Sequence, residues 1–90
     1  MSNVKVQIPS ALRPAVEGHA LVEVAAVSVK DAIGSLTIRF PKFAEKMAGP
    51  QLQRIMNIYV NDENVKFLDN LDTKLNAGDE LVIDLAITGG

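Results

Sequence analysis

The sequence contains no cysteine and only one histidine, His19. Disulfides, thiolate zinc sites, iron–sulfur clusters and cysteine nucleophiles are therefore excluded, and a single imidazole cannot make a histidine-based metal site. Aromatic residues make up 4% of the chain, and its nine lysines and arginines are scattered with no basic run. With a net charge of −2, the chain offers no phosphate-neutralising patch, which argues against nucleic-acid binding.

Long apolar runs are also absent. No stretch reaches the length of a membrane span, and residues 1–5 lack the basic start and apolar stretch of a secretory signal. We therefore expect a cytoplasmic protein that does not associate with membranes. The 90 residues are 48% hydrophobic and 22% charged, which predicts one globular domain, too small for an enclosed catalytic cleft with a lid.

The first half of the chain predicts two strands and a helix. Apolar and polar side chains alternate over residues 4–8 and 19–25, the pattern of half-buried strands. The connection between them, residues 10–18, is predicted to be a loop that Leu12 anchors to the core. Its prolines and glycine favour this interpretation.

The helix is predicted over residues 28–40. Ser28 and Asp31 form a Ser-x-x-Asp start signal, after which apolar residues fall at helical spacing. Gly34 costs about 1 kcal/mol relative to alanine inside a helix, so we expect another segment to pack tightly over it. A proline ends this helix, and a further short helical segment is expected near Phe43 and Met47, stopped by Gly49-Pro50.

A third strand is predicted over residues 54–60, because this stretch is rich in β-forming residues. Its alternation places Met56, Ile58 and Val60 on one face. Ile55 and Tyr59 fall on the other, where they would leave an apolar patch on the sheet.

The remaining segments complete the order β-β-α-β-β-β. A turn at residues 61–64 precedes a short returning strand at 65–67, and a single helical turn is expected at 71–75. Residues 81–87 alternate but are apolar on both faces, which favours a central strand. Asn61, Gly78 and Asp79 are interpreted as turn formers.

The last two residues, Gly89 and Gly90, follow this strand directly. Glycine has no Cβ, so such a tail is thin and lets its backbone approach another molecule closely. Its one reactive group is the Gly90 carboxylate, a poor electrophile until it is activated, for example as a mixed anhydride with AMP. The tail alone is compatible with a substrate of an activating enzyme or with an incidental glycine-rich end.

Several segments together resemble the ubiquitin-like sulfur-carrier family. The segments are Val60-Asn61, Asp62-Glu63, Leu75, Gly78-Asp79-Glu80-Leu81 and the terminal Gly89-Gly90. That family includes the small subunit of molybdopterin synthase, the thiamin sulfur carrier and the carrier of thiocarboxylate-dependent cysteine synthesis. Residues 8–13 and 60–67 look closest to the cysteine-pathway type, and residues 84–88 lack the prolines that molybdopterin-type carriers often have before the diglycine.

The resemblance implies an α+β fold of the β-grasp type, a mixed sheet of four to five strands over one main helix. Its first and last strands would be parallel at the centre. Residues 1–87 would form this domain and residues 88–90 a flexible tail. The protein would carry a group rather than catalyse a reaction, and would bind no cofactor itself.

Carried onto this chain, the family's chemistry falls on Gly90. A ubiquitin-activating-type enzyme would use ATP and Mg²⁺ to adenylate Gly90, and a sulfur donor would convert it to a thiocarboxylate. A sulfur-accepting enzyme would then consume it in the biosynthesis of cysteine, homocysteine or a related metabolite. Gly89 and Thr88 would serve in tail recognition, and Tyr59, Ile55 and Ile87 as a surface for partner enzymes.

Three alternatives stay open. The chain could be the small subunit of molybdopterin synthase, a ubiquitin-like modifier conjugated to target proteins through Gly90, or a β-grasp interaction domain whose tail is incidental. The sequence also leaves open the pathway served, the sulfur donor and the oligomeric state. It does not say whether an extension beyond Gly90 is removed in maturation.

Overall fold

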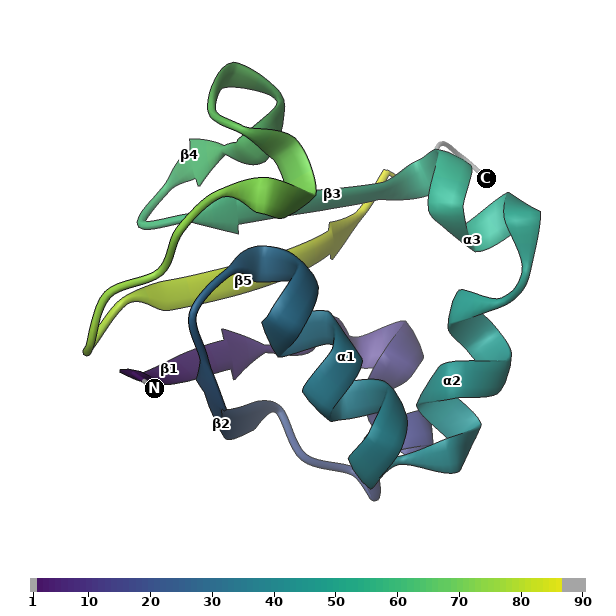
Figure 1. The fold of residues 1–90 in the computed structure, drawn as a ribbon. Coiled ribbons are helices and arrows are strands. Elements are labelled where there is room, and N and C mark those ends of the chain that lie inside the picture. The colour runs from purple at the N-terminus through teal and green to yellow at the C-terminus, as the bar shows by residue number, and fades with distance from the viewer. Residues whose placement is uncertain (1, 87–90) are drawn as a thin grey trace.

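A computed structural model describes residues 2–86; Met1 and residues 87–90 lie outside it. Helices pack on one face of a five-stranded mixed sheet (Figure 1), whose strand order is β2-β1-β5-β3-β4. The strands are β1 (Ser2–Gln7), β2 (Leu21–Ala26), β3 (Met56–Val60), β4 (Glu63–Asn64) and β5 (Glu80–Leu85). The α-helices are α1 (Val29–Arg39), α2 (Pro41–Met47) and α3 (Pro50–Ile55), and three short 3₁₀ helices are η1 (Ser10–Val16), η2 (Val65–Phe67) and η3 (Asn70–Asp72).

The two strands at the heart of the sheet come from opposite ends of the chain. β1 and β5 are parallel, with Val6 opposite Leu81, whereas β1–β2 and β5–β3 are antiparallel. The predicted parallel pairing of the first and last strands is therefore confirmed, and so is the central position of the last strand.

The core lies between the sheet and the helices. Alternate residues of β1, β2, β3 and β5 point into it, and α1 buries Val29, Ala32 and Leu36 against them. Leu12 is 2% exposed, which confirms its role as an anchor. The segment around it, however, is the 3₁₀ helix η1 rather than an irregular loop.

Helix α1 begins where the sequence predicts. The Ser28 hydroxyl accepts a hydrogen bond from the Asp31 amide (3.1 Å), and the Asp31 carboxylate accepts one from the Val27 amide (3.0 Å). The expectation of tight packing over Gly34 is wrong: a Cβ built there meets no atom within 4 Å. Gly34 lies two residues from both Ala32 and Leu36, the buried positions, and so turns toward a less crowded side.

The sequence interpretation of residues 49–56 needs correction. The short helix predicted near Phe43 and Met47 is α2, and it ends before Gly49-Pro50 as predicted. The sequence did not predict that Pro50 also begins a new helix, α3, where proline fits the first helical position because its missing N–H costs nothing there. The third strand accordingly begins at Met56 instead of residue 54, and Ile55 is the last residue of α3.

The expected returning strand at residues 65–67 is also wrong. Strand pairing ends after Asn64, whose side-chain oxygen accepts from the Lys66 amide (2.9 Å) and so starts η2. In η2 only Val65 is buried, and Phe67 is 81% exposed. The helical turn predicted at 71–75 is present one residue earlier, as η3, and Leu75 joins the core.

Candidate functional site

The residues predicted to carry the chemistry lie outside the described part of the chain. These are Gly90, Gly89 and Thr88, together with Ile87 of the predicted partner surface. The structure describes the site up to Ala86, so the geometry that can be established is that of the root from which the tail departs.

The root is fixed by backbone hydrogen bonding on the β3 side. The Ala86 amide donates to the Ile55 carbonyl at 2.7 Å, one step beyond the pairing of Leu85 with Met56. Because Gly90 is four residues past Ala86, its carboxylate can reach at most about 14 Å from this point. A partner enzyme that acts on Gly90 must therefore come close to the end of α3 and the start of β3.

The start of β5 is held by two tight turns. Asn61 and Asp62 both have positive φ angles (49° and 71°), the requirement of a two-residue hairpin turn between β3 and β4. Gly78 has φ 85° in the turn before β5, a conformation that glycine adopts without a steric cost. The interpretation of Asn61 and Gly78 as turn formers is confirmed.

Asn61 has a second role that the sequence did not reveal. Its side-chain nitrogen donates to the Asp79 carboxylate (3.0 Å), and its side-chain oxygen accepts from the Glu80 amide (3.0 Å). Asp79 in turn accepts from the Asn76 amide (2.8 Å). One side chain thus joins the β3–β4 turn to the start of β5, a link that no local sequence pattern signals because its partners are 18 and 19 residues apart.

The outer face of the sheet carries part of the predicted partner surface. Tyr59 is half-buried there and lies directly opposite Val82 of β5, which is also half-buried. The row continues through Gln7 to Leu21, which is 48% exposed. Val82 was missed as a surface residue, although the apolar character of both faces of its strand was a signal for it.

Ile55, which was predicted to share a strand face with Tyr59, is not part of β3. It is half-buried at the end of α3, and its carbonyl is the partner of Ala86. Tyr59 therefore lies on β3 in the outer face of the sheet, whereas Ile55 lies at the root of the tail. Within residues 2–86, no three histidine or acidic side chains are grouped so that they could hold a metal ion.

Residues 6–90 match the ThiS family, which is nearly the whole length of the chain. The chain belongs to the ThiS family. This membership agrees with the geometry just described, a β-grasp sheet whose central last strand leads into a diglycine. It confirms the fold class and the family resemblance drawn from the sequence.

Individual members of the family are similar over the full length. The sulfur carrier protein CysO of Mycobacterium tuberculosis is 36% identical over 92 residues, which cover 98% of this chain and 99% of that protein. Its crystal structure superposes with a TM-score of 0.84 at 34% identity, covering 93% of this chain and 99% of that one.

Two further solved structures extend the comparison. A chain in the BexX/CysO complex of Amycolatopsis orientalis has a TM-score of 0.85 at 33% identity, covering 97% of this chain and 99% of its own. Small archaeal modifier protein 1 of Methanosarcina acetivorans has a TM-score of 0.81 at 29% identity, covering 100% and 98%.

None of the helices within residues 2–86 is both long enough and apolar enough to span a lipid bilayer.

Proposed function

We infer that this ThiS-family chain is a sulfur carrier of the cysteine-pathway type, which transports sulfur as a thiocarboxylate on Gly90. The observation that carries this inference is the full-length similarity to the CysO sulfur carriers, together with the diglycine that follows the central strand of this chain. The protein is a carrier on which enzymes act, and it supplies no catalytic group of its own to the reaction.

The chemistry begins with the Gly90 carboxylate. In an adenylating enzyme, one carboxylate oxygen attacks the α-phosphorus of ATP, with Mg²⁺ neutralising the phosphates, and pyrophosphate leaves. A sulfide-level donor then attacks the acyl carbon, AMP leaves, and a C–S bond replaces the C–O bond. The resulting thioacid is a good nucleophile because its sulfur is polarisable, whereas the original carboxylate is not.

The fold supports this role through the position of β5. Both of its edges are paired, with β1 and β3, and the Ala86 amide is hydrogen-bonded to Ile55. A partner that grips the sheet therefore receives the tail from a fixed point, which lowers the entropic cost of placing Gly90 in an active site. The slim residues Gly89 and Gly90, with Thr88, suit a narrow channel.

The deciding experiment is an intact-mass spectrum after incubation with ATP, Mg²⁺, sulfide and an adenylating enzyme that acts on ThiS-family carriers. We expect an oxygen-to-sulfur mass gain that fragmentation places on Gly90. A chain without Gly89-Gly90 should show no gain while keeping the circular dichroism spectrum of the intact chain. Absence of any gain, with an enzyme that loads its own carrier in the same assay, would rule out the carrier role.

A protein modifier is the second candidate. The similarity to small archaeal modifier protein 1, at 29% identity over the whole chain, is the observation that favours it. Both roles share activation of Gly90, so they are separated by the product. Isopeptide bonds between Gly90 and lysines of other proteins would establish conjugation, and a thiocarboxylate without such adducts would exclude it.

A further inference from the structure

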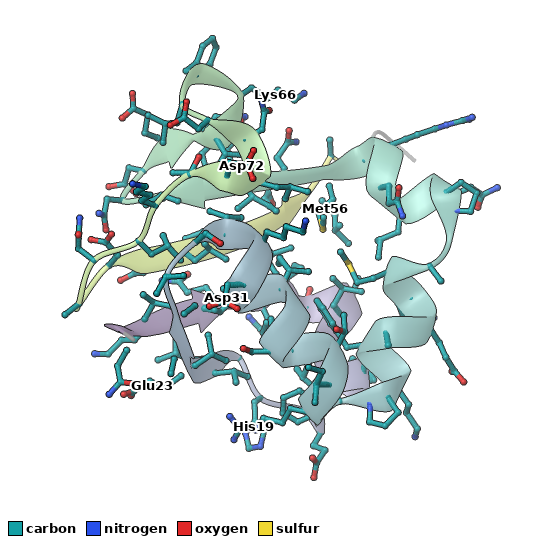
Figure 2. All side chains as sticks on the ribbon, viewed as in Figure 1. His19, Glu23, Asp31, Met56, Lys66 and Asp72 are labelled. Atoms are coloured by element: carbon teal, nitrogen blue, oxygen red, sulfur yellow. The ribbon has the colours of Figure 1, made fainter. Side chains whose placement is uncertain are left out.

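A groove of about 450 Å³ opens on the helical side of the molecule, away from the outer sheet face that carries Tyr59. Its floor is formed by the buried side chains of Ile58 and Val65, and its walls by partly exposed apolar residues. Those wall residues are Ile33, Met47, Met56 and Leu71. Figure 2 shows Met56 lying between β3 and the helices α1 and α2.

One side of this groove is an open strand edge. β4 pairs with Tyr59 and Val60 only, and in the described part of the chain no strand lies along this edge of residues 56–58. The Asn61 amide and the Ile55 carbonyl both bond toward β5. Because backbone groups alternate along a strand, those of Met56 and Ile58 face the opposite way, toward the groove. An unpaired edge of this kind is a template for another extended chain.

The charge of the groove is opposite in sign to that of the whole chain. The protein has 11 acidic and nine basic residues, yet the groove is lined by Lys30 and Lys66 and by no carboxylate. The nearest acid on α1, Asp31, is turned to the helix start, where it accepts from the Val27 amide. Asp69, which precedes η3, and Asp72, its last residue, are exposed and do not line the groove.

We propose that this groove binds an extended peptide segment of a partner protein, in which apolar residues are flanked by carboxylates. The segment adds a short strand to the edge of β3. Its alternate apolar side chains enter the groove over Ile58 and Val65, and its acidic ends meet Lys30 and Lys66. Strand addition supplies affinity through the backbone, and the pockets supply the preference for apolar side chains.

This binding site goes beyond the sulfur-carrier role, because it uses no atom of Gly89 or Gly90 and does not require Gly90 to be activated. Its location still has a functional consequence. Met56 lines the groove and is paired with Leu85, the last residue of β5. A peptide bound here therefore adjoins the root of the tail while the outer face of the sheet stays free for another partner.

The test is a titration of the full ¹⁵N-labelled chain, followed by NMR, with the end-blocked synthetic peptide Glu-Val-Ile-Val-Asp. We expect amide shift changes at Ile33, Met56, Ile58 and Leu71, and slower hydrogen exchange at Ile58. Two control peptides decide the mode of binding. Replacement of both acids by lysine, or N-methylation of the amides that face the edge, should each abolish the changes.

A charge-reversal pair tests the cationic rim. Lys30→Glu combined with Lys66→Glu should weaken binding of the acidic peptide by about tenfold, since two exposed charge contacts are lost and replaced by repulsion. The matched control, Lys42→Glu with Lys74→Glu, changes net charge equally at exposed lysines outside the groove and should leave binding within about twofold.

Three results would overturn the proposal. They are shifts confined to Leu21, Gln7 and Tyr59 on the outer face, equal binding by the N-methylated peptide, and equal weakening by both charge-reversal pairs. Concentration-dependent shifts at the groove without any peptide would instead assign it to contact between two copies of this chain.

Discussion

At the scale of single residues, a few polar and glycine positions decide where elements begin and turn. The Ser28 cap was predictable because its partner Asp31 is three residues away and the motif is local. The bridge from Asn61 to Asp79 and Glu80 was not, since it forms only after the sheet brings two distant turns together. The local cap at Ser28 was therefore visible in the sequence, and the non-local bridge from Asn61 was not.

Replacing Gly34 by alanine should stabilise the protein. The position is inside α1, and an added Cβ meets no atom within 4 Å, so the variant gains helix propensity without a clash. We expect the free energy of unfolding to rise by about 0.5–1 kcal/mol in urea denaturation. Gly78→Ala is the matched control: it has equal space but φ 85°, and should lose about 1 kcal/mol. Destabilisation by Gly34→Ala would show that the helix needs glycine there.

The Ser28 cap gives a second residue-scale prediction. Ser28→Ala removes the acceptor for the Asp31 amide and should lower the free energy of unfolding by about 1 kcal/mol. Ser10→Ala is the comparison, because Ser10 is exposed and begins η1, for which no side-chain cap is formed. Thermal unfolding monitored by circular dichroism should show a loss for the first variant only, and equal melting temperatures for the two would contradict the capping role.

At the scale of elements, hydrophobic periodicity located β1, β2, α1 and β5, because each has one buried face of regular period. It failed at α3 and η2. The run of β-forming residues from Ile55 hid the end of α3, where Gly49-Pro50 starts a helix. The alternation of Val65, Lys66 and Phe67 suggested a strand. The Asn64 side chain, however, accepts a hydrogen bond from the Lys66 amide, and the chain turns into η2 instead.

The outer face of the sheet gives the element-scale prediction. Tyr59 of β3 lies opposite Val82 of β5, the strand that leads to the tail. We expect Tyr59→Ala to weaken binding to the adenylating enzyme by about tenfold, the size of effect typical of a central aromatic contact. Isothermal titration calorimetry would measure it.

The control for this experiment is Ile38→Ala. Ile38 is 85% exposed on α1, which packs on the opposite face of the sheet. Its truncation removes apolar surface of similar kind without touching the outer sheet face. If both variants, Tyr59→Ala and Ile38→Ala, bound the enzyme with the same affinity as the parent chain, the outer face would not be the docking surface.

At the scale of the whole molecule, the sequence predicted the class and topology of the fold, including the parallel pairing of β1 with β5. The resemblance to the sulfur carriers supplied this topology, and the strand pattern agreed with it. The groove over Ile58 and Val65 could not be predicted from the sequence, since its lining comes from α1, α2, α3, β3 and the segment from Asn64 to Leu71. Such a surface exists only once these elements are assembled.

The whole-molecule prediction separates folding from function. Removing Gly89-Gly90 leaves every hydrogen bond from Ser2 to Ala86 in place, including that of Ala86 with Ile55. We expect the melting temperature to change by less than about 2 °C, while adenylation, followed as ATP–pyrophosphate exchange, is lost. A chain that unfolds on removal of the diglycine would show that the tail is part of the folded domain.

The placement of β5 between β1 and β3 also determines how the domain bears a mechanical load. In the proposed role, an enzyme that bound Gly90 in a channel would pull on the end of β5, and the hydrogen bonds on both edges of this strand would share the load in shear. An edge strand pulled from the side would instead peel away one bond at a time. The parallel neighbour β1 runs in the direction of the pull and belongs to the other end of the chain. A pull on the C-terminal tail is therefore expected to leave the domain folded.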